Sequence, residues 1–213
     1  MRLGMVTIIA LGLLGATPAL ATRKLPVGDA QGWQHAQTGL ILMSDIAGLH
    51  RTALQDLGDS ELDIVAQFDD PSRDTEATLY LFRPALDSVP VWFDRAVTTL
   101  SDHDIYGGVT PVAAPQAFAR AGGSVADSLR ETFVPAKSDF KTTALAVMPV
   151  GGWLVAIRLS GKTLAPAALD DLLTQMIAGL RFADPVAGGP AAVPVAPAQR
   201  RWRSSTPNSR SPT

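Results

Sequence analysis

The sequence predicts an α+β fold, a layered sandwich in which two amphipathic helices cover a mostly antiparallel sheet. Glu61–Pro84 places alternating apolar residues on both sides of a polar turn, as a β-hairpin does. Two later segments, starting at Val89 and Leu169, repeat apolar residues at offsets 0, 3, 4, 7, 8 and 11, which is the stripe of an amphipathic helix. The predicted strands follow one another through turns, which favours antiparallel pairing.

The segments before and within the hairpin predict the first strands. Short strands are expected at Leu40–Met43 and Leu49–Leu57. In the first arm of the hairpin, Leu62, Ile64, Ala66 and Phe68 share one face, and the other face is mostly polar. The second arm, 77–82, carries apolar residues on both faces. We therefore expect it to be a central strand that is covered on both sides.

The first helix is expected to follow Pro84, with Ser88 as its N-cap and Pro90 in its first turn. Its apolar stripe consists of Val89, Trp92, Phe93, Ala96, Val97 and Leu100. The last helix is expected at about Ala165–Leu180. Its stripe consists of Leu169, Leu172, Leu173, Met176, Ile177 and Leu180.

Between the two helices the pattern is weaker and then becomes clear again. Glycines and prolines interrupt residues 101–140, where strands are expected near Val109–Val112 and Leu129–Val134. After Lys141, strands at Thr143–Met148 and Trp153–Ser160 flank a Pro-Val-Gly-Gly turn, which predicts a second hairpin.

The N-terminus has the pattern of a secretory signal peptide. Arg2 gives a positive start, Val6–Ala16 is an apolar run of 11 residues, and Ala19-Leu20-Ala21 fits the small-x-small cleavage rule. A membrane anchor is the alternative, but a hydrocarbon core of ~30 Å needs about 20 apolar residues. We expect cleavage after Ala21, a periplasmic or secreted location, and no transmembrane segment in the mature chain.

Three regions follow from these patterns: a signal peptide at 1–21, a single α+β domain at 22–184, and a disordered Pro/Ala-rich basic tail at 185–213. After removal of the signal peptide, the part before Val186 holds 13 basic and 20 acidic residues, a net charge of −7. The tail carries four arginines and no acid. An acidic body argues against a nucleic-acid surface, because phosphate binding needs clustered positive charge.

The chain has no cysteine. Disulfides, zinc–thiolate sites, iron–sulfur clusters and a cysteine nucleophile are thereby excluded. No motif predicts a cofactor, and we expect none.

The polar turn of the hairpin is a candidate metal site. Asp69, Asp70, Asp74 and Glu76 lie within eight residues, and hard cations such as Ca²⁺ prefer six to eight oxygen ligands. The spacing is not that of the twelve-residue calcium loop, and Arg73 lies among the acids. A solvated acidic turn is the alternative interpretation.

Three other motifs contain residue types that could carry chemistry. Ala156–Thr163 fits a loose phosphate-loop pattern, but its first half alternates like a strand. Asp102-His103-Asp104 offers a base or a metal ligand, although no spacing links it to His35 or His50. Ser138–Lys141 matches S-x-x-K without the companion motifs. These patterns predict no catalytic residue.

The order of elements resembles that of the Mog1/PsbP-like domains, which are small antiparallel sheets with flanking helices. The likeness is carried by the Trp33–Gly39 segment, the LDIVAQF…ATLYLF hairpin and the closing strand and helix, and it covers Trp33–Phe182. The Ala, Pro and Arg usage is similar to that of secreted proteins of GC-rich bacteria. The resemblance implies a binding or assembly module rather than an enzyme.

Two functional hypotheses follow. The first is a non-catalytic secreted or periplasmic domain that binds a protein or cell-envelope partner. In this hypothesis the basic tail with Trp202 touches anionic lipid or another envelope polymer. The alternative is a small periplasmic hydrolase or metal-dependent enzyme, which requires Asp, His and Ser groups from separate elements to meet in one cleft.

Overall fold

The computed structural model describes residues 22–183, with gaps at 29–30, 59 and 121. The predicted signal peptide, 1–21, and the predicted tail, 185–213, lie outside the described residues.

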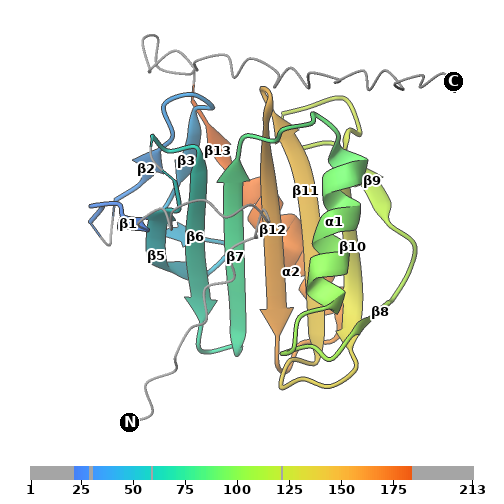
Figure 1. Ribbon diagram of the computed structural model, residues 1–213. Helices are drawn as coiled ribbons and strands as arrows, with labels where there is room; N and C mark the ends of the chain where they lie inside the picture. The colour runs from blue at the N-terminus through green and yellow to red at the C-terminus, as the bar shows by residue number, and fades with distance from the viewer. Residues whose placement is uncertain (1–21, 29–30, 59, 121, 184–213) are drawn as a thin grey trace, which may run out of the picture.

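Ten strands form one antiparallel sheet in the order β1-β5-β6-β7-β12-β11-β10-β8, with β4 paired to β5 and β9 paired to β10 (Figure 1). Its strands are β1 Arg23–Lys24, β4 Asp45–Ile46, β5 Leu49–Asp56, β6 Asp63–Asp70, β7 Thr75–Phe82, β8 Val109–Pro111, β9 Gln116–Phe118, β10 Ser128–Pro135, β11 Thr142–Val150 and β12 Trp153–Gly161.

A second, three-stranded sheet has the order β13-β3-β2. It is formed by β2 Trp33–Gln34, β3 Leu40–Leu42 and β13 Arg181–Phe182. The helices are α1, Val89–Ser101, and α2, Pro166–Gly179.

The predicted α+β class is wrong: the described chain is mostly sheet, with two short helices of 13 and 14 residues. Strands of two or three residues account for part of the difference, because such strands have no periodicity to detect and exist only through their partners. The predicted sandwich of two covering helices is also wrong, because both helices pack on the half of the sheet formed by β10–β12.

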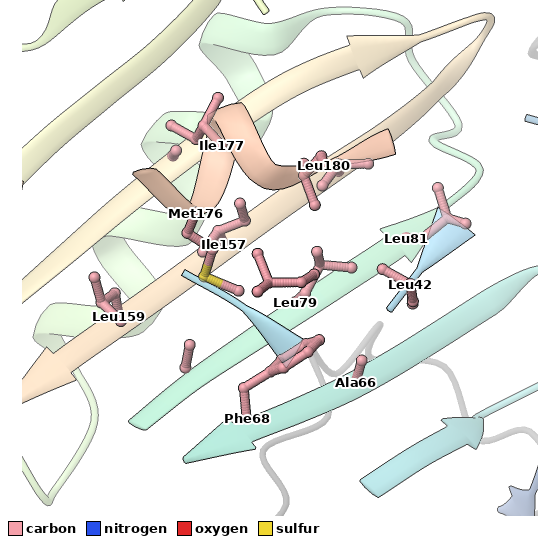
Figure 2. Close-up of a cluster of buried hydrophobic side chains, with 14 of the residues drawn as sticks. Leu42, Ala66, Phe68, Leu79, Leu81, Ile157, Leu159, Met176, Ile177 and Leu180 are labelled. Carbon is pink, nitrogen blue, oxygen red and sulfur yellow. The ribbon is translucent and has the colours of Figure 1, made fainter. Parts of the chain in front are cut away.

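The two helices lie on opposite faces of that half. Leu169, Leu172 and Met176 of α2 belong to one core, together with β3 and the inward faces of β6, β7, β11 and β12. Phe93 and Leu100 of α1 belong to a second core on the opposite face. Figure 2 shows the first core, in which Leu42 of the small sheet meets β6 and β7. The small sheet therefore covers the β5–β7 half on the α2 side.

The other face of that half is covered only in part: Val65 of β6 and Tyr80 of β7 are buried in the second core, to which α1 contributes. In Figure 1, α1 lies over β10 and β11, and no labelled helix or strand lies in front of β6 and β7. We call this side of β5–β7 the open face. Neighbouring strands present to it the residues opposite the α2-side core, such as Asp69 of β6 and Glu76 of β7.

Several local predictions are confirmed. β7 is buried on both faces over most of its length, and it lies at the centre of the sheet between β6 and β12. The second hairpin turns at Gly151 and Gly152, both with positive φ, the backbone that glycine adopts without strain. Ser88 is the N-cap residue of α1, but its side chain makes no capping hydrogen bond, which corrects its predicted role.

Among the described residues, no helix is both long and apolar enough to cross a bilayer.

Candidate functional site

A row of polar residues crosses the sheet close to the β6–β7 turn. His50, Asp69, Glu76, Ser160 and Thr143 are successive partners across β5, β6, β7, β12 and β11. Directly paired residues of antiparallel strands project from the same face, so the five side chains share the open face and its continuation toward α1. We call these residues the polar row.

The end of the polar row near α1 is buried and structural. Tyr106, which follows α1, is fully buried, and its hydroxyl lies 3.0 Å from the Ser160 hydroxyl. Ser160 is in turn 3.0 Å from the hydroxyl of Thr143. Because each buried hydroxyl has a partner, this part of the row needs no ligand to satisfy it.

The acidic end of the polar row borders an open pocket of about 150 Å³. Its lining residues are Asp69, Asp70, Pro71, Asp74, Thr75, Glu76, Phe140 and Lys162. Asp69 and Glu76 are direct cross-strand partners, and both are partly buried. The Nζ of Lys162 lies 5.9 Å from the centroid of the Phe140 ring, a cation–π contact. We call this feature the acidic pocket.

Burial disfavours the charged forms of the two paired acids of the acidic pocket. Burial raises the pKa of Asp69 above its ordinary value. Burial also raises the pKa of Glu76, and the charge of Asp69 adds to the rise, while Arg158 and Lys162 oppose it. Two carboxylates facing each other across a strand pair repel, which costs roughly 0.2–1 kcal/mol of stability. Arg158 and Lys162 are the positive groups of the chain that act on Glu76.

All four acids of the predicted cation site line the acidic pocket, but they do not project from one face of the sheet. Asp70 is paired with Thr75 one position beyond Asp69, so it projects from the other face of the sheet. There it binds Ser72 and forms an ion pair with Arg73, and these hydrogen bonds lower its pKa to about 2.

The described residues contain no group of three or more His, Cys, Asp or Glu side chains positioned to hold a metal ion. Asp74 has a positive φ of 47°, and its carbonyl accepts a hydrogen bond from the Lys162 amide, which fixes the turn against the end of β12. The predicted site at Asp69, Asp70, Asp74 and Glu76 stays a prediction, testable by calcium calorimetry.

Glu76→Gln should stabilise the protein at neutral pH by roughly 0.2–1 kcal/mol, because it removes a charge that is disfavoured by burial and repelled by Asp69. The folded state raises the pKa of Glu76, so the folded state binds more protons than the unfolded chain and stability falls as pH rises through that range. The advantage of Glu76→Gln should therefore be present at pH 7 and vanish below about pH 4. Urea unfolding across pH measures it.

Asp171→Asn is the matched control for Glu76→Gln, because Asp171 is exposed on α2, on the other side of the sheet. It removes one negative charge and should change stability by less than about 0.5 kcal/mol. An equal gain from both variants would mean that total charge, and not the Asp69–Glu76 pair, sets the effect.

His35 is a core residue. It is buried, one ring nitrogen lies 2.9 Å from the Thr38 hydroxyl, and the other lies 3.1 Å from the Glu61 carbonyl. Trp153 packs edge-on at a ring distance of 4.6 Å. Burial lowers the pKa of His35, so its neutral form is the favoured one.

A Ser44–Asp45–His50 chain on the β4–β5 hairpin, which the sequence patterns did not predict, has the residue types of a hydrolase triad. Ser44 donates to Asp45 at 2.7 Å, and the other carboxylate oxygen lies 3.1 Å from His50. In a triad the histidine stands between serine and acid and takes the serine proton. Here the acid stands in the middle, so His50 cannot activate Ser44.

The remaining sequence motifs are placed by local structure. Most of the phosphate-loop lookalike lies in strand β12, which ends at Gly161, as the alternation indicated. His103 accepts a hydrogen bond from the Ile105 amide in the turn after α1. Ser138 accepts one from the Phe140 amide. These contacts stabilise turns.

Two lining residues of the acidic pocket, Phe140 and Lys162, were not predicted as site residues. Each lies inside a motif that predicts no catalytic residue, Phe140 in the S-x-x-K match and Lys162 in the phosphate-loop lookalike. Only the pairing of β7 with β12 brings Lys162 to the acidic turn, and no local pattern encodes that pairing.

No protein-family model matches the chain, and no curated protein matches it in sequence. A similar solved structure is the solution structure of cyanobacterial PsbP (CyanoP) from Synechocystis sp. PCC 6803. It is 16% identical, with a TM-score of 0.47, over 81% of this chain and 100% of that one. The predicted resemblance to PsbP-like domains is therefore supported only as a loose similarity of fold. It does not extend to family membership, and no function is transferred from it.

Proposed function

We propose that this protein is a non-catalytic binding domain of the periplasm or the secreted space, and that the acidic pocket binds a cationic group of its partner. The extracytoplasmic location is supported by the signal pattern of residues 1–21. The observation that carries the binding site is the Asp69–Glu76 pair, two facing carboxylates with raised pKa values beside a pocket.

The form of the pocket fits a guanidinium group. Its volume of about 150 Å³ admits one side chain rather than a large metabolite. A planar guanidinium can pair with carboxylates in a bidentate manner and stack on an aromatic ring, here that of Phe140. The partner's chemistry is therefore an arginine-bearing protein segment.

A fluorescent hexa-arginine peptide tests this function on the mature chain, residues 22–213. At low salt it should bind the wild-type protein, and the double variant Asp69→Asn/Glu76→Gln should weaken binding about tenfold, because charged hydrogen bonds of about 1.5 kcal/mol are lost. Fluorescence anisotropy measures the affinity. The binding should also weaken at about 0.5 M salt.

The control for the peptide experiment is Asp171→Asn combined with Asp87→Asn, which removes two exposed charges outside the pocket. If this control loses as much affinity as Asp69→Asn/Glu76→Gln, the peptide is responding to net charge and the acidic pocket is not a recognition site. Hexaglutamate should not bind any of these proteins.

A further inference from the structure

The charge distribution points to an occupant of the acidic pocket within the chain itself. The part from residue 22 to 185 has a net charge of −7, whereas residues 186–213, outside the described part, carry four arginines and no acid. Three of these arginines flank Trp202 in the sequence Arg200-Arg201-Trp202-Arg203. This segment therefore combines the guanidinium groups and the aromatic ring that suit the carboxylates and Phe140 of the pocket.

We propose that the segment Arg200–Arg203 docks in the acidic pocket of its own chain and must be displaced before an external partner can bind. This inference rests on the proposed function and adds its regulation. An arginine of the segment would pair with Asp69 and Glu76 beside Phe140.

The chain is long enough for this contact. The last described residue, Ala183, hydrogen bonds to Gly39 through its amide, at the end of the sheet opposite the β6–β7 turn (Figure 1). β7 has eight residues and spans about 27 Å. The 16 residues between Ala183 and Arg200 give 17 steps of the chain, which reach up to about 56 Å when extended. The segment can therefore pass around the sheet edge and reach the pocket.

Replacing Lys162 should change docking of the segment in the opposite direction to replacing the acids. Its ammonium group lies over Phe140 and opposes the rise in the pKa of Glu76, so it holds the place that an incoming guanidinium would take. Lys162→Ala removes this competitor and one positive charge. It should strengthen docking of the segment, whereas Asp69→Asn/Glu76→Gln should abolish it.

The experiment is nuclear magnetic resonance on the mature chain, with {¹H}–¹⁵N heteronuclear NOEs at residues 200–203. In the wild type these amides should be restrained. They should become mobile in Asp69→Asn/Glu76→Gln and remain restrained in the control Asp87→Asn/Asp171→Asn. Uniformly mobile amides in the wild type, or restraint that appears only when anionic phospholipid vesicles are added, would overturn the proposal.

A second readout separates this proposal from the proposed function. Replacing Arg200, Arg201 and Arg203 by Gln should tighten hexa-arginine binding about tenfold, if the segment occupies the pocket about nine-tenths of the time. If the three replacements leave the peptide affinity unchanged, and peptide binding still depends on Asp69 and Glu76, the binding function stands and the docking of Arg200–Arg203 is overturned. A third outcome is that the wild-type amides are restrained but the peptide does not bind even after the three arginines are replaced. This outcome would support the internal contact and overturn the binding of an external partner.

Discussion

Phe68→Ala should lower the free energy of unfolding by about 3–5 kcal/mol. Phe68 is fully buried in β6, in the core between the large sheet, the small sheet and α2. Figure 2 shows Phe68 in the same buried cluster as Leu79 and Leu42. Truncation leaves a cavity that surrounding elements cannot fill, because strands on both sides fix the backbone of β6. Urea unfolding measures the loss as a lower midpoint at unchanged slope.

Leu86→Ala is the comparison for Phe68→Ala. Leu86 is a large apolar residue whose surface is 56% exposed, so its truncation should cost less than about 0.5 kcal/mol. A loss of under about 1 kcal/mol in Phe68→Ala would contradict the packing of the small sheet over β6 and β7.

Gly39→Ala should cost about 3 kcal/mol and detach β13 from β3. Gly39 has a positive φ of 68°, and a Cβ there would lie 1.8 Å from the carbonyl oxygen of Ala183. The two segments would have to separate, breaking the 2.8 Å hydrogen bond from the Ala183 amide to Gly39. The expected cost combines a left-handed backbone penalty of roughly 1–2 kcal/mol with about 1 kcal/mol per lost hydrogen bond.

Gly151→Ala isolates the backbone part of that effect. Gly151 also has a positive φ, 56°, but nothing lies within 4 Å of the Cβ position. Gly151→Ala should therefore lower the free energy of unfolding only by the cost of a left-handed backbone, roughly 1–2 kcal/mol. Hydrogen exchange should show faster exchange at Phe182 and Ala183 in Gly39→Ala and no change there in Gly151→Ala. Equal losses in the two variants would mean that the close approach of Ala183 is not a constraint.

The acidic turn was predictable as a candidate site, because four acids within eight residues are visible in the sequence. Once the register is known, strand alternation places the Asp69 and Glu76 side chains together on the open face. It places Asp70 on the other face, where it pairs with Arg73. The register depends on the turn geometry, including the positive φ of Asp74, which the residue types alone do not specify.

The sequence by itself determined the elements whose signal is local: the α1 and α2 stripes, the β6–β7 hairpin and the β11–β12 hairpin. Their periods reflect side-chain direction along one segment, so a short window of residues contains the information. The tertiary structure decided the mostly-β class and the pairing of β7 with β12, between residues about 80 positions apart. Such pairing depends on contacts between distant segments, and it alone places Lys162 and Phe140 beside Asp69 and Glu76.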